Sequence, residues 1–167
     1  MSEKSQKEML LFLLDETWAL VESSINGLTS EEFYWKPAPG AFEPEAAFQE
    51  MVPGVSSIGF KLAHLAINKI LVVDTFTGNG KLTIDEIAKL APKQFAGWME
   101  FVRETHAAFR RCLLEMPNEA LGSKKLIWGD QFPAWQIWIW IINHDGWHAG
   151  QIKTLRVLYQ HKGVKLA

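Results

Sequence analysis

Apolar residues recur at helical spacing in four long segments, which cover about residues 6–26, 57–77, 92–115 and 133–160. In each segment an apolar residue returns every three to four positions, as on one face of an amphipathic helix. No segment alternates convincingly between polar and apolar residues, so we expect an all-α chain without strands. Four long amphipathic helices in one chain predict a four-helix bundle.

Residues with known capping preferences indicate where the helices begin. Ser56 or Ser57 is a good N-cap for the second long helix, and Pro133 suits the first turn of the fourth. Residues 29–32 and 83–86 both have the capping-box pattern, with a threonine followed three residues later by glutamate. We therefore expect short helical turns within the long connections.

The composition narrows the class of protein. A length of 167 residues is that of one domain, which we take to span residues 1–167. The net charge of −2 and the scattered basic residues favour neither nucleic acid nor a membrane as a partner. The single cysteine, Cys112, excludes an internal disulfide. The first residues lack the apolar region of a signal peptide, and the most apolar stretch, residues 132–142, is too short to span a bilayer. We expect a cytoplasmic protein.

Two histidines four residues apart indicate a metal site. His144 and His148 leave the same face of the fourth predicted helix, so their ring nitrogens could reach one ion. His64 lies on the apolar face of the second predicted helix and points at the same core. Helical bundles build metal sites from side chains on facing helices in this way. The alternative is that these are core histidines with ordinary hydrogen-bond partners.

Three motifs make the sequence resemble the DinB/YfiT-like superfamily. They are Trp35-Lys36-Pro37, the segment SIGFKLAHLA at residues 57–66, and His144-x-x-x-His148-x-x-Gln151-Ile152. The resemblance covers nearly the whole chain. It implies a four-helix bundle that binds a divalent metal, zinc or nickel, through His64, His144 and His148. Many relatives read His-His-Arg-Gly-Gln where this chain has Trp147-His148-Ala149-Gly150-Gln151, so a basic residue beside the site is lost. An activity in which that arginine holds an anionic substrate group is therefore not expected.

Three further polar residues are candidates for supporting roles. Gln151 matches the family glutamine and either orients a metal ligand or is a surface amide. Asp145 either supports a ligand in the same way or is solvated. His106 lies on the inward face of the third predicted helix. It is either a fourth ligand, an acid or base near the metal, or a packed core residue. No residue is assigned a catalytic role.

A zinc ion held by three histidines keeps an open coordination position, as catalytic sites do. The family includes thiol-dependent S-transferases, so the resemblance implies an enzyme that attaches a low-molecular-weight thiol to a small molecule. The alternatives are a metal-dependent hydrolase and a non-catalytic, stress-associated metal-binding module. The sequence does not separate these functions, because function depends on the pocket and not on the fold.

The fourth predicted helix is apolar on more than one side in its first half. Trp135, Trp138, Ile139 and Ile142 lie opposite the histidine face, with Gly146 beside them. An aromatic outer face favours a two-fold interface, so we expect a homodimer through these residues. The alternative is that the connections at residues 28–55 and 118–132 cover this face.

Overall fold

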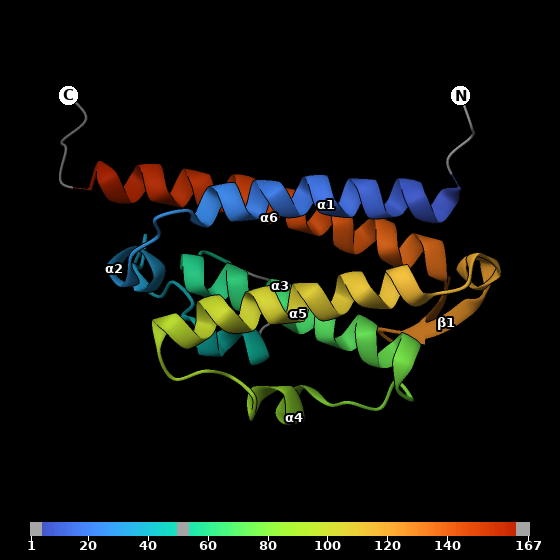
Figure 1. Ribbon diagram of the computed structural model, residues 1–167. Helices are drawn as coiled ribbons and strands as arrows, with labels where there is room; N and C mark the ends of the chain where they lie inside the picture. The colour runs from blue at the N-terminus through green and yellow to red at the C-terminus, as the bar shows by residue number, and fades with distance from the viewer. Residues whose placement is uncertain (1–4, 50–53, 163–167) are drawn as a thin grey trace, which may run out of the picture.

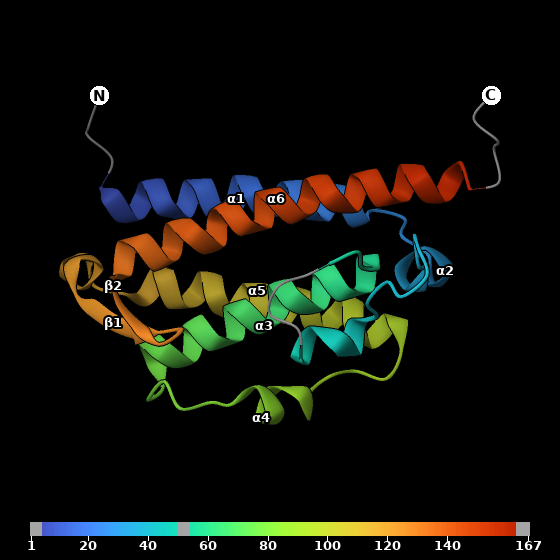
Figure 2. The same ribbon diagram turned by 180° about the vertical axis from the view of Figure 1, so that it is seen from behind.

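The computed structural model describes residues 5–49 and 54–162, and these form a four-helix bundle. The long helices are α1 (Gln6–Ile25), α3 (Ile58–Thr77), α5 (Phe95–Glu115) and α6 (Ala134–Gln160). Helices α1 and α6 lie side by side, and α3 and α5 form a second layer beside them (Figures 1 and 2). The all-α architecture predicted from the sequence is confirmed. Within the described residues, no helix is long and apolar enough to cross a membrane.

Helix α3 is the most deeply buried element. Every residue from Ile58 to Lys69 is buried, because α5, α6 and a 3-10 turn all pack against this helix. The Ser57 side chain accepts a hydrogen bond from the Phe60 amide, which fixes the start of the helix at the second of the two candidate serines. This placement sends His64 into the bundle.

The long connections contain the short helices that the capping boxes predict. Both boxes are formed, at Thr29 before α2 (Ser30–Tyr34) and at Thr83 before α4 (Ile84–Ala88). Two 3-10 turns, η1 (Pro44–Phe48) and η2 (Asn118–Gly122), complete the connections. The connection between α1 and α3 packs onto the N-terminal half of α3 and thereby closes one end of the bundle.

The expectation of a chain without strands was wrong in one place. Strands β1 (Lys124–Ile127) and β2 (Asp130–Pro133) form an antiparallel hairpin at the other end of the bundle. Its two-residue turn has positive φ at Trp128 (53°) and Gly129 (85°), as a type I′ hairpin turn requires. Strands of four residues are too short to show a reliable alternation. Pro133 is the last residue of β2 and the N-cap of α6, so it lies just before the first helical turn and not within it.

The tryptophans of α6 do not all lie where the sequence placed them. Trp138 is fully buried, with its ring 4.6 Å from that of Phe109 and 5.2 Å from that of Phe76. Ile142 is also buried in the same apolar cluster. The assignment of these two residues to an outer face was wrong, because α3 and α5 cover a second side of α6. Trp135 is exposed and Ile139 is half-buried.

Candidate metal centre

The three histidines predicted to bind a metal come together between α3 and α6. Nε2 of His144 lies 3.1 Å from Nε2 of His64 and 3.0 Å from Nε2 of His148. One ring nitrogen of each lies within 4.8 Å of the others. Donors about 2.0–2.1 Å from a tetrahedral zinc ion are about 3.3 Å apart, so this set fits an ion after small shifts. A histidine cluster that could hold a metal is present, and the identity of the metal does not follow from it.

Gln151 fixes the orientation of the His148 ring. Nδ1 of His148 lies 2.8 Å from Oε1 of Gln151, and an amide oxygen only accepts. Nδ1 therefore carries the hydrogen, which leaves the Nε2 lone pair directed at the other histidines. Of the two roles considered for Gln151, the structure supports the orienting one.

All three rings are uncharged near neutral pH. Burial lowers the pKa of His64 to about 4, of His144 to about 3 and of His148 to about 2. The histidines also lower one another's pKa, because two imidazolium ions this close repel. Neutral imidazole is the form that binds metals, so the site is prepared for a cation without first losing protons.

A cavity of about 310 Å³ opens beside the histidines. Its lining comes from α3, the hairpin turn and α6, and consists of His64, Asn68, Trp128, Trp140, Ile141 and His144. The Trp128 ring lies 5.9 Å from that of Trp140 at the rim. A bulky residue rarely adopts the positive φ that Trp128 has, and here the hairpin turn uses it to place an indole over the cavity. The aromatic residues line this space and do not fill it.

Asp145 is neither solvated nor in contact with the histidine nitrogens. It is fully buried, and its carboxylate lies 2.8 Å from the ammonium of Lys69, which is also buried. The prediction of a solvated side chain was wrong because the adjacent face of α6 packs against α3. Burial raises the pKa of Asp145 and lowers that of Lys69, while the attraction between them opposes both shifts.

His106 does not belong to the histidine cluster of the described residues. Its ring stacks on Trp18 with the centroids 3.8 Å apart, and burial lowers its pKa to about 3. The structure therefore matches the packed core residue among the roles considered. Cys112 is buried in the apolar cluster around Trp138, and burial raises the pKa of its thiol to about 11.

Sequence reasoning missed four residues around the centre: Lys61, Asn68, Trp128 and Trp140. The Asn68 amide donates to the His64 carbonyl oxygen at 2.9 Å, and its nitrogen lies 3.4 Å from Nε2 of His64. Asn68 stands four residues after His64, so helical spacing could have revealed it. Trp128 had no such signal, because it enters the site from a turn that the sequence pattern did not predict.

These features define a helical-bundle protein with a buried histidine triad that could bind a metal. The family model of the DinB superfamily matches residues 13–152, and the chain belongs to this superfamily. A crystal structure of a conserved protein from Enterococcus faecalis has a similar fold, with a TM-score of 0.63. The similarity covers 96% of this chain and 100% of that chain at 16% sequence identity, so it concerns the fold alone. No curated protein matches the sequence.

Proposed function

We propose that this protein is a metal-dependent enzyme that transfers a low-molecular-weight thiol to a small electrophilic molecule. The observation that carries the proposal is the convergence of three uncharged imidazole nitrogens beside an open cavity. Beside that cavity, which His64 and His144 line, the described residues supply three histidine ligands, and this number fits a catalytic metal site better than a structural one with four. The thiol as cosubstrate comes from the family resemblance.

The three histidines would hold a zinc or nickel ion, which would supply the Lewis acidity that keeps a thiol deprotonated at neutral pH. Gln151 holds His148 in the tautomer that ligation needs. The rim tryptophans, Trp128 and Trp140, would shield the apolar part of a substrate from water.

Metal analysis followed by a transfer assay tests this proposal. Protein loaded with zinc or nickel is mixed with 2-mercaptoethanol and 1-chloro-2,4-dinitrobenzene, and formation of the thioether is followed by absorbance. We expect turnover above the uncatalysed rate that requires the metal and disappears in His148→Ala. His161→Ala is the matched control, because His161 is exposed at the end of α6.

The same preparation separates the alternatives. Metal binding with ester hydrolysis and no thioether would indicate a metal-dependent hydrolase. Metal binding without turnover of any tested substrate would indicate a non-catalytic module. A protein that binds no divalent metal under competition with a weak chelator would contradict all three functions.

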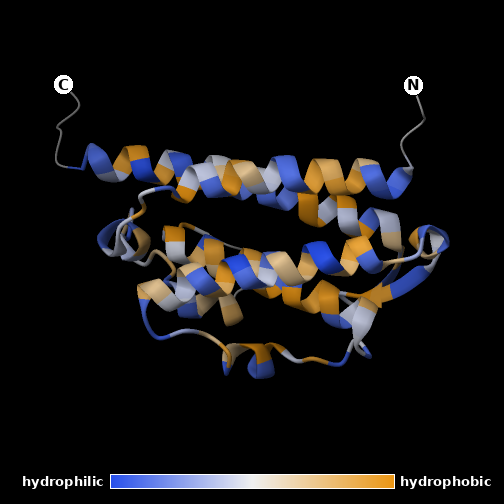
Figure 3. Cartoon of the chain, viewed as in Figure 1, coloured by the Kyte–Doolittle hydropathy of each residue, from blue (hydrophilic) through white to orange (hydrophobic). Residues whose placement is uncertain are grey.

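We also propose a homodimer, through a smaller patch than the sequence suggested. Met9 and Leu13 of α1 line an apolar depression of about 280 Å³ together with Trp135 and Ile139 of α6. The three residues Met9, Leu13 and Trp135 are 48%, 46% and 43% exposed, and Figure 3 shows apolar positions along the N-terminal half of α1. Apolar surface of this kind favours association. Gly146 does not belong to this patch, because it packs against Thr17 within the subunit.

Light scattering at micromolar concentration tests the dimer. The unaltered protein should have the mass of two chains, and Leu13→Glu combined with Trp135→Glu should have the mass of one. Lys153→Glu, a change at an exposed position elsewhere on α6, serves as the control. A monomeric unaltered protein would exclude the dimer.

A further inference from the structure

Lys61 is a buried cation with no anionic partner among the described residues. It is 7% exposed, and its ammonium donates to the Ser56 hydroxyl at 3.0 Å. Lys69, two turns further along the same helix, is 1% exposed and pairs with Asp145 at 2.8 Å. Buried charges in proteins are normally paired, because removing them from water is costly. Burial accordingly lowers the pKa of the Lys61 ammonium.

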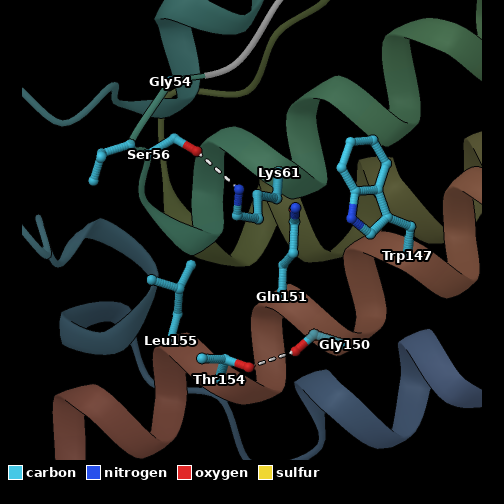
Figure 4. Close-up of a pocket in the computed structure, with 9 residues that line it drawn as sticks. Gly54, Ser56, Lys61, Trp147, Gly150, Gln151, Thr154 and Leu155 are labelled. Carbon is cyan, nitrogen blue, oxygen red and sulfur yellow. Dashed lines mark hydrogen bonds between the residues drawn. The ribbon is translucent and has the colours of Figure 1, made fainter.

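Lys61 lies at the wall of a second pocket, of about 530 Å³ (Figure 4). The pocket is lined by Gly54, Val55, Ser56, Lys61, Trp147, Gly150, Gln151, Thr154 and Leu155. Five of these residues carry side-chain hydrogen-bond donors. The Thr154 hydroxyl donates to a backbone carbonyl oxygen of its own helix, and Trp147 has an indole N–H. The other three donors are the Lys61 ammonium, the Ser56 hydroxyl and the amide nitrogen of Gln151. None of the lining residues that the structure describes is acidic. The pocket also borders the N-terminal end of α3, where the helix dipole favours negative charge.

The pocket adjoins the histidine centre on the side away from the cavity of Trp128. Gln151 lines the pocket with one end of its amide and bonds His148 with the other. Trp147 stacks on the His148 ring at 5.4 Å between centroids and is 62% exposed. A molecule in this pocket would therefore lie next to the metal ligands.

We propose that this pocket binds a small organic acid, with its carboxylate at Lys61, Ser56 and Gln151 and its apolar part against Trp147. One cation with two neutral donors matches the single charge and two oxygens of a carboxylate, whereas a phosphate dianion needs more positive charge. Many relatives have an arginine at the position of Ala149, so this chain lacks that positive charge. Lys61 would supply a positive charge beside the centre instead. The proposal rests on the proposed transferase function, because it assigns the bound acid as one of the two reactants. The acid is either the thiol cosubstrate or its electrophile.

Binding of 2-naphthoate to the metal-free protein tests the pocket without reference to catalysis. Calorimetry should show 2-naphthoate binding at least about tenfold more tightly than its neutral analogue 2-naphthamide, since a charge-assisted bond is at stake. Lys61→Met should remove this preference, Lys61→Arg should retain most of it, and Lys153→Met should leave it unchanged. Circular dichroism of Lys61→Met checks folding, and Trp147→Ala, at an exposed position, should weaken both probes. Equal affinity for the two probes, or a preference that survives in Lys61→Met, overturns the proposal.

Cobalt-loaded protein identifies which reactant carries the acid. Thiolate binding changes the cobalt absorption, so 3-mercaptopropionate can be compared with 2-mercaptoethanol. A Lys61-dependent preference for the acidic thiol supports the thiol as the source. If both thiols bind equally and 2-naphthoate still binds beside them, the electrophile is the reactant that carries the carboxylate. If the protein binds no metal but retains the 2-naphthoate preference, the transferase function fails and the carboxylate pocket stands.

Discussion

Helices α3 and α6 build two polar clusters inside the bundle, and the clusters differ in charge and in whether they border a cavity. The Lys69–Asp145 pair joins opposite charges at 2.8 Å in a fully buried environment. The triad of His64, His144 and His148 brings together three uncharged imidazoles, with one nitrogen of each within 4.8 Å of the others. Asp145 is adjacent to His144 along the chain, so the clusters are neighbours on the same two helices.

The comparison shows that burial alone does not indicate function. The ion pair compensates its own charges, although Oδ2 of Asp145 has no hydrogen-bond partner among the described residues. Neither residue lines the Trp128 cavity or the Lys61 pocket, and the pair joins α3 to α6. The triad borders a cavity through His64 and His144, and burial disfavours its protonated form, so a bound metal ion would stabilise it. Lys61 is a buried cation without an anionic partner among the described residues, and it too borders a pocket. The histidine triad and Lys61 border pockets, whereas other buried polar atoms without a hydrogen-bond partner in the described part of the chain, such as Nε1 of Trp98 and Nδ1 of His106, belong to residues that do not line those two pockets.

The largest effect on stability should follow from breaking the Lys69–Asp145 pair. Asp145→Leu leaves the Lys69 ammonium buried and unpaired, which should lower the free energy of unfolding by about 3–5 kcal/mol. Urea unfolding followed by circular dichroism measures the change. The double variant Lys69→Met and Asp145→Leu should recover most of the lost stability. If the double variant is as unstable as Asp145→Leu, the pair stabilises the fold by more than the compensation of its two charges.

Loss of a histidine from the triad should lower metal affinity and leave the stability of the metal-free protein nearly unchanged. His148→Ala removes one of three ligands, so zinc affinity should fall by at least about a hundredfold, while the metal-free protein keeps its stability to within about 1 kcal/mol. Competition with a chromophoric chelator measures the affinity, with His161→Ala as the control. The metal-free protein should remain helical, because its apolar core does not depend on the ion. Unchanged affinity in His148→Ala would remove this residue from the ligand set.

The sequence predicted the helices and the His144–His148 pair because both depend on local spacing, and His64 was added by its place on the apolar face of its helix and by the family resemblance. Capping boxes, helical periodicity and the four-residue interval between His144 and His148 are all short-range signals. The Lys69–Asp145 pair and the Trp128 rim join elements that are far apart in the chain, and no local pattern records which faces meet. Trp138 was misplaced for the same reason. A periodic pattern shows that a helix is apolar on two sides, but not that other helices of the same subunit cover both.

Gln151 tests the support of the triad separately from its ligands. Gln151→Leu should leave three nitrogens able to bind zinc but release the His148 ring, so affinity should fall by about ten- to a hundredfold. Gln151→Glu should restore much of it, because a carboxylate also accepts from Nδ1 of His148. The chelator competition used for His148→Ala measures both variants. Zinc affinity unaltered in Gln151→Leu would mean that packing alone orients the ring.

The smallest effect concerns His106, which stands near Lys69 in the closed part of the interior. Its pKa in the folded protein is lowered to about 3 by burial and then by the charge of Lys69, against an ordinary value of 6.5. A base whose pKa is depressed by folding stabilises the fold fully above pH 6.5 and progressively less as the pH falls towards 3. The metal-free protein should therefore lose stability on acidification, each such histidine contributing at most about 1.4 kcal/mol per pH unit.

His106→Gln should reduce that slope by one histidine's share, as measured by urea unfolding between pH 6.5 and 4. Zinc affinity at pH 7 should be unchanged, because His106 stacks on Trp18 and does not lie among the triad nitrogens. The two measurements together distinguish the clusters: a residue of the closed interior alters the pH dependence of stability only, whereas a ligand alters metal binding as well. Loss of zinc affinity in His106→Gln would place this histidine in the open site after all.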